Sequence, residues 1–455
     1  MWHVTRTRDL LALRVTSLWR LFRAQGFVYW AMCCYLLVEY VRPQQLISSL
    51  NFVPVGQIVL GAAVLAHVGS GRWFAMKGLG SWLLLAFTAV ILLSSLTAYN
   101  PSIAVGALRV WLSWVVIYFL IITVVNTEQR LLFFTLLWLL FHFYMAQGGA
   151  KQFALRGFTF IREGALGAPG WFRNSGEFGI AMCMFLAIAW HYYLAARPYL
   201  TKWRKAAVLL MPLTAIVSIV GSSSRGAVLG LGAVGVWSLL QTKHRVRSAV
   251  GLAALITVVW LIVPPEFKAR FSAAGRDPDS INRLTYWKNG LDMARGHPLL
   301  GVGYENWQAY YTSHYVVPGQ LFVDTRGVVQ VPHNIFIECV AELGYVGLSV
   351  FVLLILATLR INAQTRKHAR AGPAPPNDLL IHLAYAFDTA MISYLVCGFF
   401  VTVLYYPFFW INLAFTVALG AIAQRTRGRR VAAPPGHGAF EHMSRRGNLA
   451  EPSGR

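Results

Sequence analysis

The chain has 455 residues, of which 57% are hydrophobic and only 13% are charged, and its mean hydropathy is +0.54. Soluble domains carry roughly 25% charged residues, so this composition excludes an ordinary soluble protein and indicates a polytopic membrane protein. The net charge of +23 would suit nucleic acid, but the basic residues are scattered between apolar runs, which membrane topology explains better. We therefore expect membrane lipids as partners and no nucleic acid.

The N-terminal segment, residues 1–26, is basic and leads into an apolar run. That run ends at Glu39 and Arg42-Pro43 rather than at a small-residue cleavage site, so we expect a retained first helix. The cysteines all fall inside apolar runs without metal-ligand spacing, which predicts neither a zinc site nor a disulfide framework. They are Cys33, Cys34, Cys183, Cys339 and Cys397.

Twelve apolar runs, most of them able to cross ~30 Å of hydrocarbon, predict an all-α fold with about 12 transmembrane helices. Nine runs precede a long polar loop, residues 265–332, and three follow it. Residues 423–455, rich in Pro, Gly and Arg, are expected to form a disordered basic tail. The predicted spans are 27–41, 53–69, 79–97, 104–125, 131–147, 176–195, 206–221, 226–241, 248–264, 333–359, 380–402 and 404–422.

Short connections rich in Lys and Arg stay in the cytoplasm, which predicts the orientation. With twelve spans, the basic connections all fall on one side, so both termini are expected in the cytoplasm and the loop 265–332 outside. The basic residues of these connections include Arg6, Arg8, Arg14, Arg20, Arg23, Arg72, Lys77, Arg130, Arg197, Lys202, Arg204, Lys205, Lys243, Arg245, Arg247, Arg360, Arg366, Lys367, Arg370 and Arg425.

Five arginines depart from this rule because they fall at the outer ends of spans or in outer loops. They are Arg42, Arg109, Arg173, Arg225 and Arg283. Arginine at such a place favours an anion, since its planar fork binds phosphate oxygens in bidentate fashion. The alternative is pairing with Glu39, Glu163, Glu177 or a lipid phosphate.

Arg225 carries the sharpest of these signals, because Gly221-Ser222-Ser223-Ser224-Arg225-Gly226 is a small-residue turn between two apolar runs. Backbone N–H groups and hydroxyls would surround its guanidinium, which suits a phosphate. A tight polar hairpin without function is the alternative.

The large loop contains a second arginine in a helical pattern. Ser280 is expected to cap a helix on which Tyr286 and Trp287 flank Arg283 and hold its side chain flat. The Asp277-Pro278-Asp279 spacing occurs in metal-dependent glycosyltransferases, but the glycine and proline around it favour a turn and a helix cap instead.

His333 follows Pro332 at the start of the next apolar run, and Asn334, Glu338 and Glu342 recur at four-residue spacing along the expected helix. A histidine there is usually a cap or a surface residue, but the membrane boundary and the nearby arginines favour a catalytic base. His142, His191, His382 and Asp388 lie inside apolar runs and would suit a proton path, so a proton-coupled transporter is the alternative class.

These motifs, taken in their order, resemble the O-antigen ligase and Wzy-type polymerase superfamily. The order is Ser224-Arg225-Gly226, Arg283 with Trp287, Gly301-Val302-Gly303-Tyr304, His333-Asn334, and Glu342-Leu343-Gly344-Tyr345-Val346-Gly347. The resemblance covers roughly residues 170–360. Tyr40-Val41-Arg42-Pro43-Gln44 also resembles the exosortase A system-associated O-glycosylation ligases, on one short motif.

The resemblance implies a metal-independent, inverting glycosyltransferase without a cofactor, at the periplasmic face of the bacterial inner membrane. Its donor would be a glycan on undecaprenyl diphosphate, and its acceptor a hydroxyl of lipid A-core, of a protein, or of the growing glycan, which would make it a polymerase. His333 would be the base and Arg225 and Arg283 the diphosphate ligands, with Arg173 a looser match. Tyr304, Glu338, Glu342 and Arg109 are candidates for supporting roles.

Overall fold

The computed structural model describes residues 7–46, 52–159, 164–242, 244–262, 265–272, 275–316, 329–371 and 375–432, and its elements are all helices. The helices are α1 (Thr7–Leu11), α2 (Val15–Arg23), α3 (Phe27–Tyr40), α4 (Pro43–Leu46), α5 (Val55–Gly69), α6 (Gly78–Leu96), α7 (Pro101–Val124), α8 (Glu128–Leu155), α9 (Ser175–Ala196), α10 (Lys202–Gly221), α11 (Arg225–Gln241), α12 (Arg245–Ile262), α13 (Pro265–Ser272), α14 (Pro278–Gly296), α15 (Trp307–His314), α16 (Ile335–Arg370), α17 (Asp378–Gly398) and α18 (Pro407–Ala432).

The protein is an all-α polytopic membrane protein, as the sequence predicts. Within the described ranges, eight helices are long and apolar enough to cross a membrane: α6, α7, α8, α9, α10, α16, α17 and α18. The other four predicted spans also coincide with helices, of which α3 and α5 are apolar but shorter. Several helix ends differ from the predicted spans, and three helices continue well beyond them. Helix α8 continues to Leu155 instead of ending at residue 147. Helix α16 continues to Arg370, and α18 continues to Ala432, into the segment predicted as a tail, whose residues 433–455 lie outside the described part.

Helix α9 forms the centre of the bundle. It packs along α10 and α17, and its side chains are buried around most of its circumference, with Ile180 and Phe185 fully enclosed. An apolar helix buried on all sides is typical of the interior of a large helical protein. The N-terminus of α9 is therefore held firmly at one end of the bundle.

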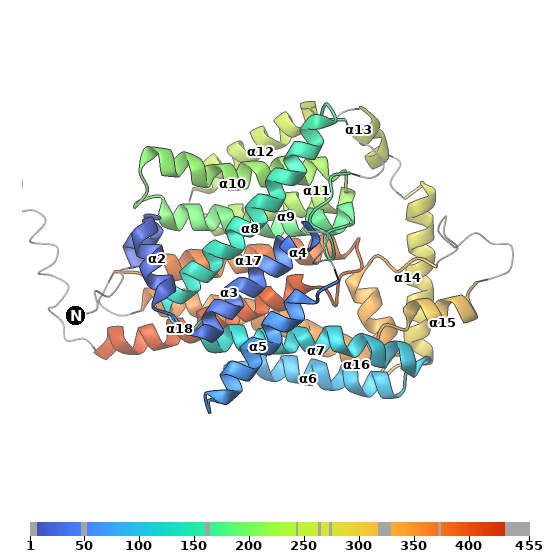
Figure 1. Cartoon of the computed structure of the whole chain (residues 1–455). Coiled ribbons are helices and arrows are strands. Elements are labelled where there is room, and N and C mark those ends of the chain that lie inside the picture. Colours follow the sequence, from blue (N-terminus) through green and yellow to red (C-terminus); the bar gives the residue numbers. More distant parts are fainter. Residues whose placement is uncertain are drawn as a thin grey trace, which may run out of the picture.

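The elements of the large loop gather at one end of the bundle. Figure 1 shows α14 standing across the ends of the long helices, with α15 beside it, while α2 and the C-terminal end of α18 lie at the opposite end. Helix α14 packs against α16. The arrangement agrees with the predicted separation of the large loop from the N-terminal region.

Helix α16 is interrupted at Gly344, whose φ of 65° and ψ of −171° lie outside the helical region. Just before the interruption, the carbonyls of Ala341 and Glu342 accept the N–H groups of Val302 (2.8 Å) and Gly303 (3.2 Å) from the large loop. A side chain at position 344 would meet the Leu299 carbonyl oxygen at 2.4 Å. The glycine motif of the large loop and the one in α16 thus form a single joint.

Candidate functional site

The joint lies beside a cavity of about 490 Å³, a volume suited to a substantial organic ligand. The cavity lies among the start of α9, the start of α11, α14, the first turns of α16 and the connection between α17 and α18. Its lining residues are Trp171, residues 174–177, residues 223–226, Arg283, Glu305, Trp307, Gln308, residues 331–333, Glu338, Glu342, residues 400–402, Tyr405 and Tyr406.

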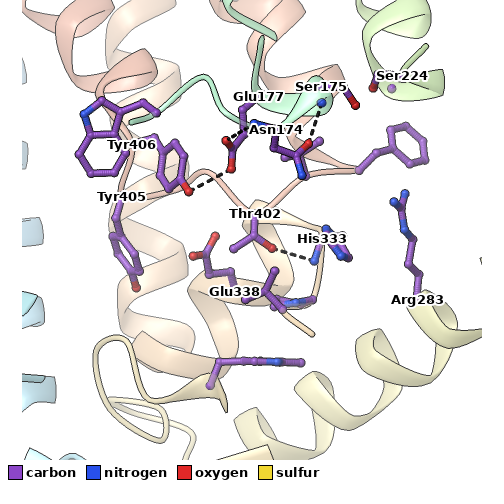
Figure 2. A pocket seen from close by; sticks show the side chains of 18 of the residues that line it. Asn174, Ser175, Glu177, Ser224, Arg283, His333, Glu338, Thr402, Tyr405 and Tyr406 are labelled. Carbon is purple, nitrogen blue, oxygen red and sulfur yellow. Dashed lines mark hydrogen bonds between the residues drawn. The ribbon is translucent and has the colours of Figure 1, made fainter. Parts of the chain in front are cut away.

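Five of the predicted site residues line this cavity: Arg225, Arg283, His333, Glu338 and Glu342. They come from α11, from α14 and from the region around the start of α16, so only the folded bundle brings them together. We call the part formed by Arg225 and Arg283 the cationic end. In Figure 2, Arg283 lies at one side, Glu338 and Tyr405 lie at the other, and His333 lies between them.

Three other predicted residues do not line the cavity. Tyr304 is buried behind it, with its ring 4.8 Å from that of Tyr405 in an edge-to-face arrangement. Arg109 and Arg173 are exposed, Arg109 on α7 and Arg173 just before α9. Their contribution to substrate binding remains a prediction.

Arg42 pairs with a glutamate, which is the alternative to binding an anion. Its guanidinium forms an ion pair with Glu39 at 3.6 Å, and its Nε donates to the Glu39 carbonyl. The same group lies directly against Gly170, whose φ of 94° suits glycine. Arg42 therefore supports the segment that leads to Trp171, while Glu163 lies outside the described residues.

The turn before α11 has the predicted form. Ser224 is the N-cap of α11 and accepts the N–H of Ala227 at 3.3 Å. Arg225, the first residue of the helix, donates from Nη1 to Oδ2 of Asp277 at 3.0 Å and from Nη2 to Oδ1 at 3.4 Å. The guanidinium thus already holds a carboxylate in the bidentate manner expected for a phosphate.

Asp277, and not Ser280, caps helix α14. The Asp277 carboxylate accepts the N–H of Ser280 at 3.1 Å and its hydroxyl at 2.6 Å. Hydrogen bonds from Arg225, above all, hold the pKa of Asp277 below its usual value. The prediction of Ser280 as the cap is wrong by three residues, because Pro278 already suits the first helical position. These contacts agree with the interpretation of Asp277-Pro278-Asp279 as a turn and helix cap.

His333 precedes α16 rather than beginning it, because Asn334 is the N-cap and accepts the N–H groups of Phe336 and Ile337. The backbone N–H of His333 donates to Oγ1 of Thr402 at 2.8 Å, and its Nε2 lies 3.4 Å from the Gln330 side chain. Loss of hydration, followed by the charge of Arg283, lowers the pKa of His333 to about 4. The imidazole is therefore neutral at neutral pH.

The cavity wall contains three residues with strained backbones. Ser223, Glu305 and His333 have φ values of 54°, 55° and 51°, in the left-handed region that residues other than glycine rarely adopt. Such strain costs about 1–3 kcal/mol for each residue and tends to occur at functional sites. Its concentration around one cavity supports a role in ligand binding.

Four glutamates line the cavity, and we call their part the acidic end. It comprises Glu177, Glu305, Glu338 and Glu342. Glu342 accepts the N–H groups of Glu305 (3.1 Å) and Trp307 (2.9 Å) and the hydroxyl of Tyr405 (2.9 Å), so its buried carboxylate anchors the large loop. Glu338 accepts the N–H of Leu404 at 3.3 Å.

Sequence reasoning missed several cavity residues. Glu177 accepts the hydroxyl of Tyr406 at 3.0 Å and belongs to the capping box of α9, although the sequence presents it only as a possible partner of an outer arginine. Thr402 and Tyr405 were assigned to predicted spans, but they lie in the connection between α17 and α18. The proline at position 407, which begins α18, is the signal that could have placed that connection.

Two of the intramembrane polar residues, Asp388 and His142, have local partners, whereas neither ring nitrogen of His191 has a hydrogen-bond partner among the described residues. Asp388 accepts hydrogen bonds from Arg366 Nη1 at 2.5 Å and from Asn362 Nδ2 at 2.8 Å. The His142 ring stacks on Trp138 with 3.6 Å between the ring centroids. The buried ion pair thus explains the presence of Asp388 inside the bundle without a proton path.

Comparison with known proteins identifies the segment that carries this site. The family model for O-antigen ligases matches residues 206–352, which include Arg225, Arg283, His333, Glu338 and Glu342. Residues 206–352 are thus similar to the O-antigen ligase family. The predicted resemblance to the O-antigen ligase and Wzy-type superfamily is therefore confirmed over this segment, whereas membership of the exosortase-associated subgroup stays a prediction.

Part of the chain is also similar to part of a bacterial polysaccharide protein. A stretch of 138 residues, 29% of the chain, is 28% identical to the exopolysaccharide production protein ExoQ of Rhizobium meliloti. The matched stretch covers 31% of that protein's length. The cavity is lined both by residues of the matched segment 206–352 and by residues outside it. The latter come from the start of α9 and from the connection between α17 and α18.

Proposed function

We propose that the protein transfers a glycan from undecaprenyl diphosphate to an acceptor hydroxyl at the periplasmic face of the bacterial inner membrane. The observation that carries the proposal is the meeting of Arg225, Arg283 and His333 in one cavity, since all three belong to the segment that matches the O-antigen ligase family. If the enzyme is a ligase, the acceptor is a lipid A-core sugar or a protein. It is the growing glycan in the polymerase reading.

The cationic end supplies what a diphosphate leaving group requires. Diphosphate departs readily when its developing charge is stabilised, and two guanidinium groups do so without a metal ion. Arg225 stands at the N-terminus of α11, where the helix dipole and the backbone N–H groups add to the favourable field. We therefore assign the diphosphate to this end of the cavity.

We assign His333 the role of the base that takes the acceptor proton. In the proposed step, the acceptor oxygen attacks the anomeric carbon of the donor sugar as its proton passes to the imidazole. The bond between that carbon and the diphosphate oxygen breaks, and its electron pair leaves with undecaprenyl diphosphate. A single displacement of this kind inverts the anomeric configuration.

The low pKa of His333 predicts a specific pH dependence. For kcat/KM of the donor, which reports the free enzyme, we expect the acid limb at about pH 4 rather than about 6.5, because loss of hydration and the charge of Arg283 disfavour imidazolium. The negative charge of bound diphosphate stabilises imidazolium, so the acid limb of kcat should lie at higher pH. Rate profiles with saturating and limiting donor measure both limbs. A donor kcat/KM limb at about pH 6.5 would contradict the assignment.

The ion pair between Asp277 and Arg225 predicts that Asp277→Asn binds diphosphate more tightly. Asparagine caps α14 as well as aspartate does, but it removes the anion that competes for the Arg225 guanidinium. The pair is about one-fifth exposed, so a gain of up to about fivefold is expected. Titration of wild type and variant with farnesyl diphosphate measures it. Weaker binding to Asp277→Asn would show instead that the pair positions Arg225.

The proposed location predicts the accessibility of introduced cysteines. The native cysteines are first replaced, because Cys34 is exposed and would itself react. Single cysteines are then introduced at positions 173, 225, 283 and 333. They should react with a membrane-impermeant thiol reagent in intact spheroplasts. Position 173 should react most, because Arg173 is exposed. Positions 204 and 367, also exposed, should react only after lysis. The reverse pattern would place the cavity on the wrong side of the membrane.

The proposal is tested directly with purified protein, a lipid-linked glycan and a hydroxyl acceptor. We expect undecaprenyl diphosphate to appear only when the acceptor is present, and we expect a metal chelator to leave the rate unchanged. Comparing lipid A-core, protein and free glycan as acceptors separates a ligase from a polymerase. Movement of the intact lipid-linked glycan across a proteoliposome membrane, with no bond broken, would favour the transporter and contradict the proposal.

A further inference from the structure

Glu305 differs from the other glutamates of the cavity in how its carboxylate is used. The carboxylates of Glu177, Glu338 and Glu342 accept hydrogen bonds from the protein. Glu305 contributes its backbone N–H to Glu342, but no hydrogen bond within the described residues involves its carboxylate, which lies exposed in the cavity. Among the residues that the structure describes, it is thus the carboxylate of the acidic end that is open to a ligand.

The backbone of Glu305 is held in place from both sides. Glu342, almost fully buried, accepts the N–H of Glu305 and the N–H of Trp307, which brackets the strained residue. On the other side, Gly303 docks on the interrupted helix α16. Strain persists in a native structure only where its surroundings enforce it. The joint therefore presents the Glu305 side chain to the cavity at a fixed position.

Aromatic rings complete this part of the wall. Trp171 and Tyr406 line the cavity, with their ring centroids 4.7 Å apart in an edge-to-face arrangement, and Tyr406 donates its hydroxyl to Glu177. In Figure 2, Tyr406 and Glu177 lie away from Arg283. Apolar ring surface next to hydrogen-bond acceptors matches the two kinds of surface that a sugar presents, its C–H face and its hydroxyl groups.

We propose that Glu305 binds a hydroxyl of the acceptor sugar and excludes acceptors that carry a negative charge near the reacting hydroxyl, so that the acceptor is a neutral or amino sugar. This inference rests on the proposed function, because it assumes that the diphosphate occupies the cationic end. It goes further by defining the chemical class of the acceptor. Glu305 acts here as a residue that determines specificity and touches the substrate.

The selectivity follows from the chemistry of an ionised carboxylate. A carboxylate accepts strong hydrogen bonds from hydroxyl and ammonium groups. A second carboxylate or a phosphate at the same place would be repelled, and repulsion of the wrong ligand is an effective source of specificity. The neighbouring glutamates increase this repulsion, whereas the arginines lie at the other end.

The test measures the binding of three methyl glycosides that differ in one group: methyl glucoside, methyl glucosaminide and methyl glucuronide. Their dissociation constants are obtained by saturation-transfer NMR with the purified full-length protein and saturating farnesyl diphosphate, which fills the cationic end. Loss of hydration raises the pKa of the Glu305 carboxyl, so the measurement is repeated at several pH values from neutral upward to favour the carboxylate. Wild type is compared with Glu305→Gln, which retains the shape and removes the charge.

Asp292→Asn is the matched control. Asp292 belongs to α14, is outside the cavity lining and forms an exposed ion pair with Arg295. The Asp292→Asn substitution therefore changes the charge of the same region outside the membrane but does not alter the lining of the cavity.

We expect wild type and Asp292→Asn to bind the glucoside at least about tenfold more tightly than the glucuronide. In Glu305→Gln this ratio should fall to within about threefold, and binding of the glucosaminide should weaken. A purely structural role of Glu305 would change all three affinities together and leave their ratios unchanged.

Three results would overturn the inference. They are equal affinity of wild type for glucoside and glucuronide, an unchanged ratio in Glu305→Gln, or no glycoside signal in a preparation that binds farnesyl diphosphate. Failure of the proposed function is recognised separately, because it would show as absent farnesyl diphosphate binding or as binding that Arg283→Lys does not weaken. The Glu305-dependent sugar preference could persist in that case.

Discussion

Replacing His333 with alanine is expected to lower turnover by about a hundred- to ten-thousandfold, the usual contribution of general-base catalysis. Donor binding should remain nearly intact, because the imidazole contacts the acceptor proton and the arginines contact the diphosphate. Isothermal titration with farnesyl diphosphate and a turnover assay on the same preparation measure the two effects side by side.

Two further variants make this result specific. His333→Asn tolerates the left-handed backbone at φ 51° and retains a polar side chain, so it separates loss of the base from local unfolding. His314→Ala removes an exposed histidine of α15 outside the cavity lining and should behave as wild type. Normal turnover of folded His333→Asn would show that His333 is not the base, and Glu338 or Glu342 would be the next candidates.

Replacing Arg225 or Arg283 with lysine is expected to lower turnover by about ten- to a hundredfold. Lysine retains the charge but loses the planar fork, and a charge-assisted contact of this kind contributes about 1.5–3 kcal/mol. In contrast to His333→Ala, these variants should also weaken farnesyl diphosphate binding. Turnover and titration of each variant measure both effects.

The chain offers controls for the arginine variants as well. Arg295→Lys, on the exposed part of α14, should leave binding and turnover unchanged. Arg173→Lys tests whether an exposed arginine outside the cavity lining still contributes to donor binding. If Arg225→Lys and Arg283→Lys both bound farnesyl diphosphate as wild type does, the cationic end would not be the diphosphate site.

The sequence was sufficient to predict the long apolar helices and that Arg225, Arg283 and His333 lie in one cavity. Apolar runs near membrane-spanning length have few alternatives to a helix, because backbone groups in lipid must be satisfied internally. Once the spans alternate, Arg225, Arg283 and His333 must fall at the same end of the bundle. The charge rule therefore predicted their proximity without any knowledge of the packing.

The interior of the site could not be predicted in the same way. The run beginning at His333 reads as one continuous helix, and its interruption at Gly344 depends on the docking of Val302 and Gly303 from a distant loop. The position of Glu305 follows from that joint. A short polar connection such as the one around Thr402 is also difficult to predict, because the apolar runs on either side of it are almost continuous in the sequence.

The most direct test of the account is the anomeric configuration of the bond that the enzyme forms. Direct attack of an acceptor held at the acidic end on a donor held at the cationic end requires inversion. NMR of the product made from a synthetic donor of defined configuration determines the outcome from the anomeric coupling constant. A single displacement predicts inversion relative to the donor in every transferred unit. Retention would contradict it, because it would indicate a covalent intermediate, for which the cavity glutamates are the available nucleophiles.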